Sequence, residues 1–389
     1  MGISQAVDGR TPIHNFYSAR SWIEGSALQQ LDTVAALPGV KAVAAMPDLH
    51  PGKYGPVGCA ILANNVHPHF VGSDIGCGMG LFQLDIPFRK LRTDKVAGRL
   101  AVLDEPWDGD IHAALESSGL SPTPFDPSLG SIGGGNHFCE FQAIEDVFQR
   151  EMASEAKLDP SLAYILVHSG SRGLGFSILE RQLAAGIVTF DRRGEAEACY
   201  LEGHDHALRW AALNRQVIAS RAAAAARGEA RLVADLSHNF MEITPAGVLH
   251  RKGAAPSDRG LVPIPGSRAT LSYLAEPLTP CRPEALASLA HGAGRKYDRA
   301  SMHGRVRTKK SDLARLARNP FGGIILCEDR DLLVEEAGDA YKNVDRTIAD
   351  LADFGLARVA ASFRPLITFK TARASSPAKP GKPWQEDRR

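Results

Sequence analysis

The chain has 389 residues, of which 44% are hydrophobic and 23% are charged, so it is long enough to bury a large core. Aromatic residues make up only 7% of the chain and glycine occurs 37 times, which favours a loop-rich enzyme over a helical bundle. The net charge of +1 excludes a protein that is basic as a whole, although a local basic groove for nucleic acid is not visible in that sum.

Cysteine usage and hydropathy indicate the compartment. The six cysteines are scattered without short pairings, and we find neither a signal peptide nor an apolar run of membrane length. We therefore expect a cytoplasmic protein with reduced thiols, no membrane partner and no disulfide framework.

Apolar segments that run into polar residues recur along the chain. Residues 19–37 repeat apolar side chains at helical spacing, which predicts an amphipathic helix. Asp48 and His50 follow the first apolar strand-like stretch, and His168 and His238 follow later ones. The stretches that predict strands are 40–52, 57–72, 162–173 and 230–240.

The second half of the chain contains two further helical patterns. Residues 205–228 are rich in alanine, and residues 340–353 carry another helical repeat. From Thr371 onward, residues 371–389 have the composition of a disordered tail. Because no convincing linker precedes residue 371, we predict one large domain over residues 1–370.

Five side chains that can bind metals lie beside glycine-rich segments. An acid and a thiol stand three positions apart among four glycines in "FVGSDIGCGMG", and a histidine follows three glycines in "SIGGGNHF". Alone, each histidine is more often structural and the cysteine more often a small apolar residue. Together they suit one or two divalent cations, which a thiolate can bridge. The predicted ligands are Asp74, Cys77, His137, His168 and His238.

The segment "LAHGAGRKYDR" indicates a second kind of chemistry. Its glycines let a phosphate or a base approach the backbone, and Arg295 offers a planar fork for phosphate. An imidazole nitrogen of His291 can attack phosphorus and hold it covalently. The alternative is a turn that carries a surface histidine.

These motifs together resemble the RtcB family of RNA ligases. The matching segments occur in family order and span about residues 20 to 370. The length and loop spacing resemble the branch known as release-factor-H-coupled RtcB. The segments are "MPDLHPGKYGPVG", "VGSDIGCGMG", "SIGGGNHFCEF", "HSGSRGLG", "SHNF", "RKGAA", "IPGSRATLSY", "AHGAGR" and "AYKNVDRTI".

The resemblance implies an activity and a fold. The activity is a GTP- and manganese-dependent ligation, in RNA repair or tRNA splicing. It joins RNA ends that carry a 2′,3′-cyclic phosphate or 3′-phosphate to ends that carry a 5′-hydroxyl. The implied fold is α+β, with central β-sheets flanked by helices. The branch implies a functional link to a release-factor-like protein.

The resemblance also assigns roles to residues. Asp74 and Cys77 match the family's bridging-metal pair, and the three histidines named above match its other ligands. His291 matches the guanylated histidine, and Asp48 matches the acid that orients it. With the glycine-rich spacing, the predicted nucleotide-binding set is Asn136, His291, Gly292, Gly294, Arg295 and Lys370.

Three departures from the family pattern leave these ligands in place. Ala290 stands where the family has serine, and "EEAGDAYK" at 335–342 replaces a proline-containing run before Tyr341. Both bear on nucleotide preference and binding strength. The nineteen residues after Lys370 exceed the usual family end and bear on partners and substrate access.

Two other functions fit the same residues. A metal-dependent RNA phosphodiesterase or phosphatase would use the metal ligands without His291 or GTP. A non-catalytic RNA-binding protein would keep only the pocket, although the intact ligand set argues against it. Cysteine and histidine suit zinc at least as well as manganese, so manganese rests on the family alone.

Overall fold

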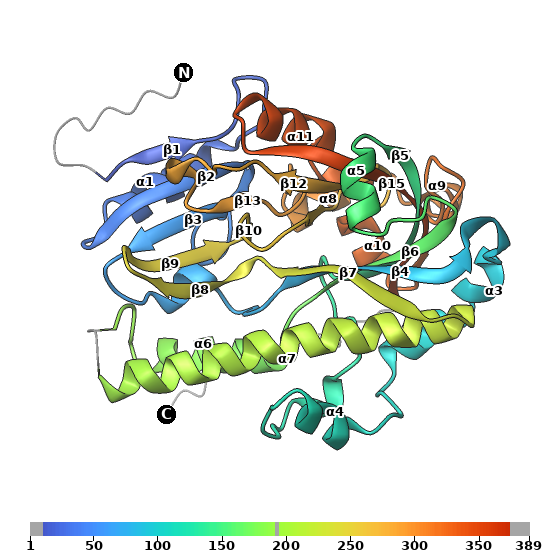
Figure 1. The fold of residues 1–389 in the computed structure, drawn as a ribbon, viewed down its shortest axis with the longest axis horizontal. Coiled ribbons are helices and arrows are strands. Elements are labelled where there is room, and N and C mark those ends of the chain that lie inside the picture. Colours follow the sequence, from blue (N-terminus) through green and yellow to red (C-terminus); the bar gives the residue numbers. More distant parts are fainter. Residues whose placement is uncertain (1–10, 191–193, 374–389) are drawn as a thin grey trace, which may run out of the picture.

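A large, mostly antiparallel sheet forms the centre of the protein (Figure 1). The computed structural model describes residues 11–190 and 194–373, and within them this sheet has eight strands. Its strand order is β11-β12-β15-β5-β6-β4-β7, and β14 pairs with β15. The strands are β4 (Gly78–Pro87), β5 (Phe138–Val147), β6 (Leu162–Ser169), β7 (Ala230–Ser237), β11 (Val262–Ile264), β12 (Ser272–Pro277), β14 (Ile324–Cys327) and β15 (Ala357–Thr371).

A second sheet lies beside the first and carries Asp48. In the described chain it has five strands in the order β1-β2-β3-β9-β8, and a separate pair, β10 and β13, lies close to β2 and β3. The strands are β1 (Ile13–Asn15), β2 (Val40–His50), β3 (Val57–Ala63), β8 (Asn239–Thr244), β9 (Gly247–Lys252), β10 (Ala254–Pro256) and β13 (Ser288–Ala290). Its core is built of small and branched apolar residues, as a sheet buried on both faces requires.

One long helix, α7 (Glu195–Ala226), runs along both sheets (Figure 1). Its alanines allow close packing against β4, β6 and β7, and Trp210 is fully buried. The helix begins ten residues before the predicted 205–228. Shorter helices of the same region are α1 (Gly25–Ala35), α2 (Pro68–Val71), α3 (Thr93–Ala97), α4 (Ile111–Ser117), α5 (Arg150–Glu155), α6 (Gly173–Ala184) and α11 (Val344–Asp353).

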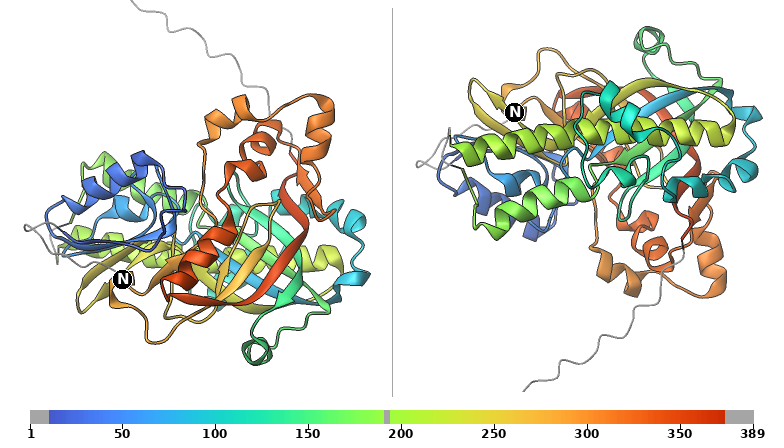
Figure 2. Two further views of the ribbon diagram at one scale, coloured as in Figure 1. Left: turned by 90° about the horizontal axis from the view of Figure 1, so that it is seen from above. Right: turned by 90° about the horizontal axis from the view of Figure 1, so that it is seen from below.

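A helical lobe projects from the body of the protein next to β14 of the larger sheet (Figure 2). It contains α8 (Arg299–Arg305), α9 (Lys310–Leu316) and α10 (Arg330–Glu335), which pack around the buried side chains of Met302 and Val334. Turns of 3-10 helix complete the described chain at Phe88–Lys90, Leu100–Asp104, Asp126–Ser128, Pro283–Ala285 and Gly338–Ala340.

The mixed α+β architecture confirms the expected fold, and further boundaries besides that of α7 differ from the sequence prediction. The first helix begins at Gly25 rather than residue 19, and Trp22 is 53% exposed. The helix expected over 340–353 begins at Val344, where Asn343 caps it. Strand β15 continues to Thr371, whose hydroxyl donates to Asp104, so ordered chain extends past the predicted domain end. The rest of the predicted tail, 374–389, lies outside the described residues.

Candidate metal centre and nucleotide site

Strand pairing brings three predicted metal ligands together where neighbouring strands of the larger sheet begin or end. The first residue of β4 directly follows Cys77 and pairs with Ser169 of β6 and with Ser237 of β7. His168 precedes Ser169, and His238 follows Ser237. Because β4 is antiparallel to both neighbours, its start lies beside their ends. The register therefore places the thiol between the two imidazoles.

The same rule places His137. This residue directly precedes β5, whose first residue pairs with His168. Asp74 lies in the turn before β4, where the backbone N–H of Cys77 donates to its carbonyl oxygen at 3.1 Å. All five predicted ligands thus meet at the starts of β4 and β5 and the ends of β6 and β7.

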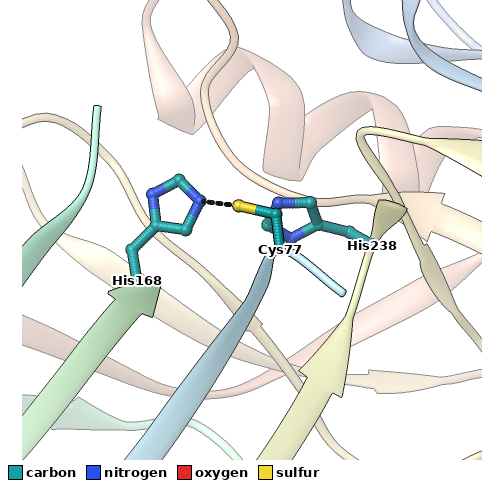
Figure 3. Close-up of side chains that lie close together, drawn as sticks. All are labelled: Cys77, His168 and His238. Carbon is teal, nitrogen blue, oxygen red and sulfur yellow. Dashed lines mark hydrogen bonds between the residues drawn. The ribbon is translucent and has the colours of Figure 1, made fainter. Parts of the chain in front are cut away.

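The ligand atoms approach closely enough to share cations. Cys77 Sγ lies 3.4 Å from Nε2 of His137 and 3.1 Å from Nε2 of His168. Figure 3 shows the side chains of Cys77, His168 and His238 directed toward one another from three neighbouring strands. These three form one group of potential ligands, and Asp74, Cys77 and His137 form a second, each with its ligand atoms within 4.8 Å. Cys77 belongs to both groups, which is the position of a thiolate that bridges two cations.

Backbone carbonyls fix the orientation of two imidazoles. His137 Nδ1 lies 3.2 Å from the carbonyl oxygen of Ile132, and His168 Nδ1 lies 3.1 Å from that of Asn136. A carbonyl oxygen only accepts, so both Nδ1 atoms carry the hydrogen and both Nε2 lone pairs face the cluster. This is how metal-binding histidines are usually held.

Asp74 gives a test of whether the residues fit a cation. Its Oδ2 lies 2.8 Å from His137 Nε2, so two lone pairs face each other, an arrangement that a cation or a shared proton stabilises. Its Oδ1 is buried and has no hydrogen-bond partner among the described residues. A Cβ at Gly170 would lie 2.1 Å from that oxygen, so the glycine provides the space for the carboxylate. The donor set fits one or two divalent cations.

Burial sets the protonation of the cluster. It raises the pKa of the Cys77 thiol well above its usual value, and the Asp74 charge adds to the rise. It lowers the pKa of His168 and His238 well below the usual value, and charges on neighbouring histidines add to this. Neutral imidazoles are ready to bind a metal, whereas the thiol must lose its proton to do so.

Two polar residues of α7 hold the backbone next to Cys77 and His168 in place. Arg215 is buried and donates through Nη1 to the carbonyl oxygens of Gly76 at 2.7 Å and Ser169 at 3.0 Å. Asn214 donates to the carbonyl oxygen of Gly170 at 3.2 Å. Neither residue was assigned a role from the sequence. Their position as two polar side chains within an alanine-rich helix was the pattern from which such a role could have been predicted.

His291 lies beside the metal ligands, directly after β13. Its ring centroid is 4.5 Å from that of His238. Its Nδ1 lies 2.6 Å from Oδ2 of Asp48, although the two atoms are not aligned as a hydrogen bond, and its backbone N–H donates to the same oxygen at 3.1 Å. A carboxylate at Nδ1 leaves the lone pair on Nε2.

A cavity opens beside His291. Its walls also include every other residue predicted to bind nucleotide: Asn136, Gly292, Gly294, Arg295 and Lys370. The cavity thus brings these residues together around one space.

Arg295 and Gly294 also make contacts within the protein. The Arg295 guanidinium donates to Glu336 at 2.8 Å and to the carbonyl oxygens of Glu335 and Tyr297. Gly294 has φ +73°, and a Cβ there would lie 2.2 Å from the Asp48 carbonyl oxygen. This glycine is therefore needed for loop packing, and phosphate contact by Arg295 stays a prediction.

Two charged residues in the cavity wall were given no role from the sequence: Glu140 and Glu336. Burial raises the pKa of Glu140 to about 7, against hydrogen bonds from Thr368 and Gln142. Burial acts to raise the pKa of Glu336, but Lys370 and Arg295 outweigh it and hold that pKa at about 2. An acid within the apolar segment "FCEF" was the available signal for Glu140.

Comparison with known proteins identifies the family. The chain matches the family described as "tRNA-splicing ligase RtcB" over residues 30–105 and 118–371.

In the described residues no helix is both long and apolar enough to cross a membrane.

Curated relatives agree along nearly their whole length. The chain is 42% identical to the RNA-splicing ligase RtcB2 of Escherichia coli over 361 residues, which cover 90% of this chain and 93% of that protein. It is 30% identical to the RNA-splicing ligase RtcB of Mycobacterium tuberculosis over 87% of this chain and 99% of that protein. It is 27% identical to the tRNA-splicing ligase RtcB of Archaeoglobus fulgidus over 92% of this chain and 94% of that protein. This chain belongs to the RtcB family of tRNA-splicing ligases.

Proposed function

We propose that this chain joins an RNA end with a 2′,3′-cyclic phosphate or 3′-phosphate to an end with a 5′-hydroxyl, using GTP and a guanylated His291. Membership of an RNA ligase family supports ligation of RNA. The observation that carries the proposal is the position of His291. It contacts Asp48, lies beside His238 and lines the cavity.

The imidazole of His291 is prepared for nucleophilic attack. With Asp48 beside Nδ1, the Nε2 lone pair attacks the α-phosphorus of GTP and pyrophosphate leaves. The Asp48 carboxylate stabilises the positive charge that the ring acquires when the new N–P bond forms. Asn136, Gly292, Gly294, Arg295 and Lys370 hold the nucleotide in the cavity.

The RNA 3′-phosphate has no good leaving group, and transfer of GMP to it supplies one. GMP passes from His291 to the RNA 3′-phosphate, which breaks the N–P bond and forms a phosphoanhydride. The 5′-hydroxyl then attacks the RNA phosphate, and GMP leaves. A cyclic phosphate is first hydrolysed to a 3′-phosphate.

Asp74, Cys77, His137, His168 and His238 would hold one or two manganese ions. A bound cation would supply neutralisation of phosphate charge and an in-line geometry. The protein's own contribution is to converge these side chains and to keep the imidazoles of His168 and His238 neutral.

Labelling with α-³²P-GTP and manganese tests the proposal. The wild type should retain the label and join 3′-phosphate RNA, whereas His291→Ala should do neither and should still bind metal. His303→Ala, at an exposed histidine of the helical lobe, is the matched control and should behave as the wild type. If the wild type takes up no label and His291→Ala still cleaves cyclic phosphates, the enzyme is the metal-dependent phosphodiesterase instead.

The remaining proposals concern the setting of the reaction. We propose that the chain acts in the cytoplasm on RNA with broken ends, in functional association with a release-factor-like protein. The resemblance to the release-factor-H-coupled branch supports this. Co-purification of the chain with such a factor under native expression would test it.

A further inference from the structure

A groove at the far end of β4 from the metal ligands is strongly basic. Its positive residues are Lys90, Arg92, Lys95, Arg99 and Arg227, and none of its described wall residues is an acid. The rest of the wall is apolar. Because the whole chain has a net charge of only +1, this groove is a local concentration of positive charge.

Three short segments supply these side chains. Lys90 ends the turn of 3-10 helix after β4, Lys95 lies in α3, and Arg227 directly follows α7. Figures 1 and 2 both show α3 next to the C-terminal end of α7. The end of a helix favours positive charge, and Arg99 supplies it, because Nη1 donates to the carbonyl oxygen of Ala225 at 3.1 Å.

The other four cations have no partner within the described chain. Over residues 11–190 and 194–373, the side chains of Lys90, Arg92, Lys95 and Arg227 form neither an ion pair nor a hydrogen bond, and all four are exposed. Solubility is served equally well by cations spread over the surface, whereas cations gathered in one groove repel one another. Such a groove favours a partner with many negative charges.

The position of the groove sets the size of that partner. Strand β4 has ten residues and begins directly after Cys77, and Ile86 near its other end lines the groove. At ~3.3 Å per residue, the two ends of the strand lie about 30 Å apart. In a nucleic acid duplex this distance corresponds to on the order of ten base pairs.

Two further grooves connect the basic groove to the metal cluster. The first shares Arg99 with the basic groove, and the second shares Glu105 and Pro106 with the first. Arg172 lines the second groove, and its charge interacts with the predicted metal ligand Asp74. Arginines and acids line the two connecting grooves in equal number, so the positive excess is confined to the far end.

On the basis of the proposed function, we propose that the basic groove binds the phosphate backbone of a base-paired RNA stem, on the order of ten base pairs from the ends that are joined. Contacts to phosphates supply affinity and orientation without reading the sequence. The groove therefore favours broken ends that adjoin a long stem over the ends of short single strands, whatever their sequence.

The test measures RNA binding by fluorescence anisotropy in the absence of GTP, so that no ends are joined. Two RNAs carry the same 3′-phosphate end. In one RNA the end adjoins a stem of about 15 base pairs, which is long enough to reach the groove. The other RNA is a single strand of a few nucleotides.

A groove variant and a control variant lose the same net charge. The groove variant combines three substitutions: Arg92→Gln, Lys95→Gln and Arg227→Gln. The control variant replaces exposed arginines on other surfaces, before α1, in α5 and in α6: Arg20→Gln, Arg150→Gln and Arg181→Gln.

The dissociation constant for the long-stem RNA should rise at least about tenfold in the groove variant, and the slope of its logarithm against the logarithm of salt concentration should fall by about 2–3. The control variant should bind this RNA as the wild type does. Both variants should bind the short strand as the wild type does, which also shows that they are folded.

Equal dissociation constants of the groove variant and the control variant for the long-stem RNA would overturn the inference and leave an acidic protein segment as the partner of the groove. That result would not affect the joining of short strands through His291. A wild type that takes up no label from GTP and joins no RNA ends would overturn the proposed function instead.

Discussion

Asp48 and His291, 243 positions apart in the chain, contact each other through two atoms of the histidine. Asp48 Oδ2 lies 2.6 Å from Nδ1 of the ring and accepts the backbone N–H of the same residue at 3.1 Å. Asp48 is fully buried near the end of β2, whereas His291 lies on the loop after β13. Gly294 closes this loop against the Asp48 carbonyl. The ring is therefore held by packing as well as by charge.

Asp48→Asn should slow guanylation without removing the nucleophile. The amide has nearly the same shape but no negative charge, so it neither fixes the Nδ1–H tautomer nor stabilises the charged ring. We expect the rate of GTP labelling to fall by roughly 10²-fold or more. Metal affinity, measured by titration calorimetry, should not change. Labelling at the wild-type rate would show that the contact only supports folding.

Gly294→Ala should destabilise the protein and displace His291. The position has φ +73°, which is unfavourable for alanine, and the new Cβ would meet the Asp48 carbonyl. We expect a loss of about 1–3 kcal/mol in the free energy of unfolding, measured in urea. Gly304→Ala is the control, because a Cβ at that position in α8 meets nothing within 4 Å. Equal stabilities for the two variants would contradict the packing argument.

Cys77→Ser should weaken metal binding more than any change at another buried thiol. The serine hydroxyl is a poorer ligand than a thiolate, and Cys77 belongs to both ligand groups. Manganese affinity should drop at least about tenfold by calorimetry. Cys139→Ala removes a fully buried thiol from the sheet core and should leave that affinity unchanged. Equal affinities in wild type and Cys77→Ser would place the metal elsewhere.

Glu140→Gln should change how stability depends on pH. Burial raises the pKa of Glu140 from 4.5 to about 7 in the folded protein, so its folding contribution is favourable below pH 4.5 and is lost as pH rises through 7. Glutamine does not titrate, so the variant should gain up to ~3 kcal/mol relative to wild type between those pH values. Urea unfolding from pH 5 to pH 8 measures this gain. Parallel stability curves would show that Glu140 titrates normally.

The residue chemistry of the site was available from the sequence. Acid, thiol and imidazole side chains beside glycine-rich turns predicted a metal cluster, and the structure brings those five residues together. The helix boundaries at Gly25 and Glu195 were not predicted. Local periodicity does not decide where a helix begins when tertiary packing and capping determine its ends.

Only the tertiary structure decided which residues face one another. The ligands converge because β4 is antiparallel to both β6 and β7, and strand register is a long-range property that no local pattern contains. In the sequence, Arg268 and Arg295 look alike, because each closely follows a glycine in a family motif, "IPGSRATLSY" and "AHGAGR" respectively. Folding engages the guanidinium of Arg295 with Glu336 and leaves Nη1 of Arg268 without a partner in the described chain, because donors and acceptors are paired by packing across separate elements.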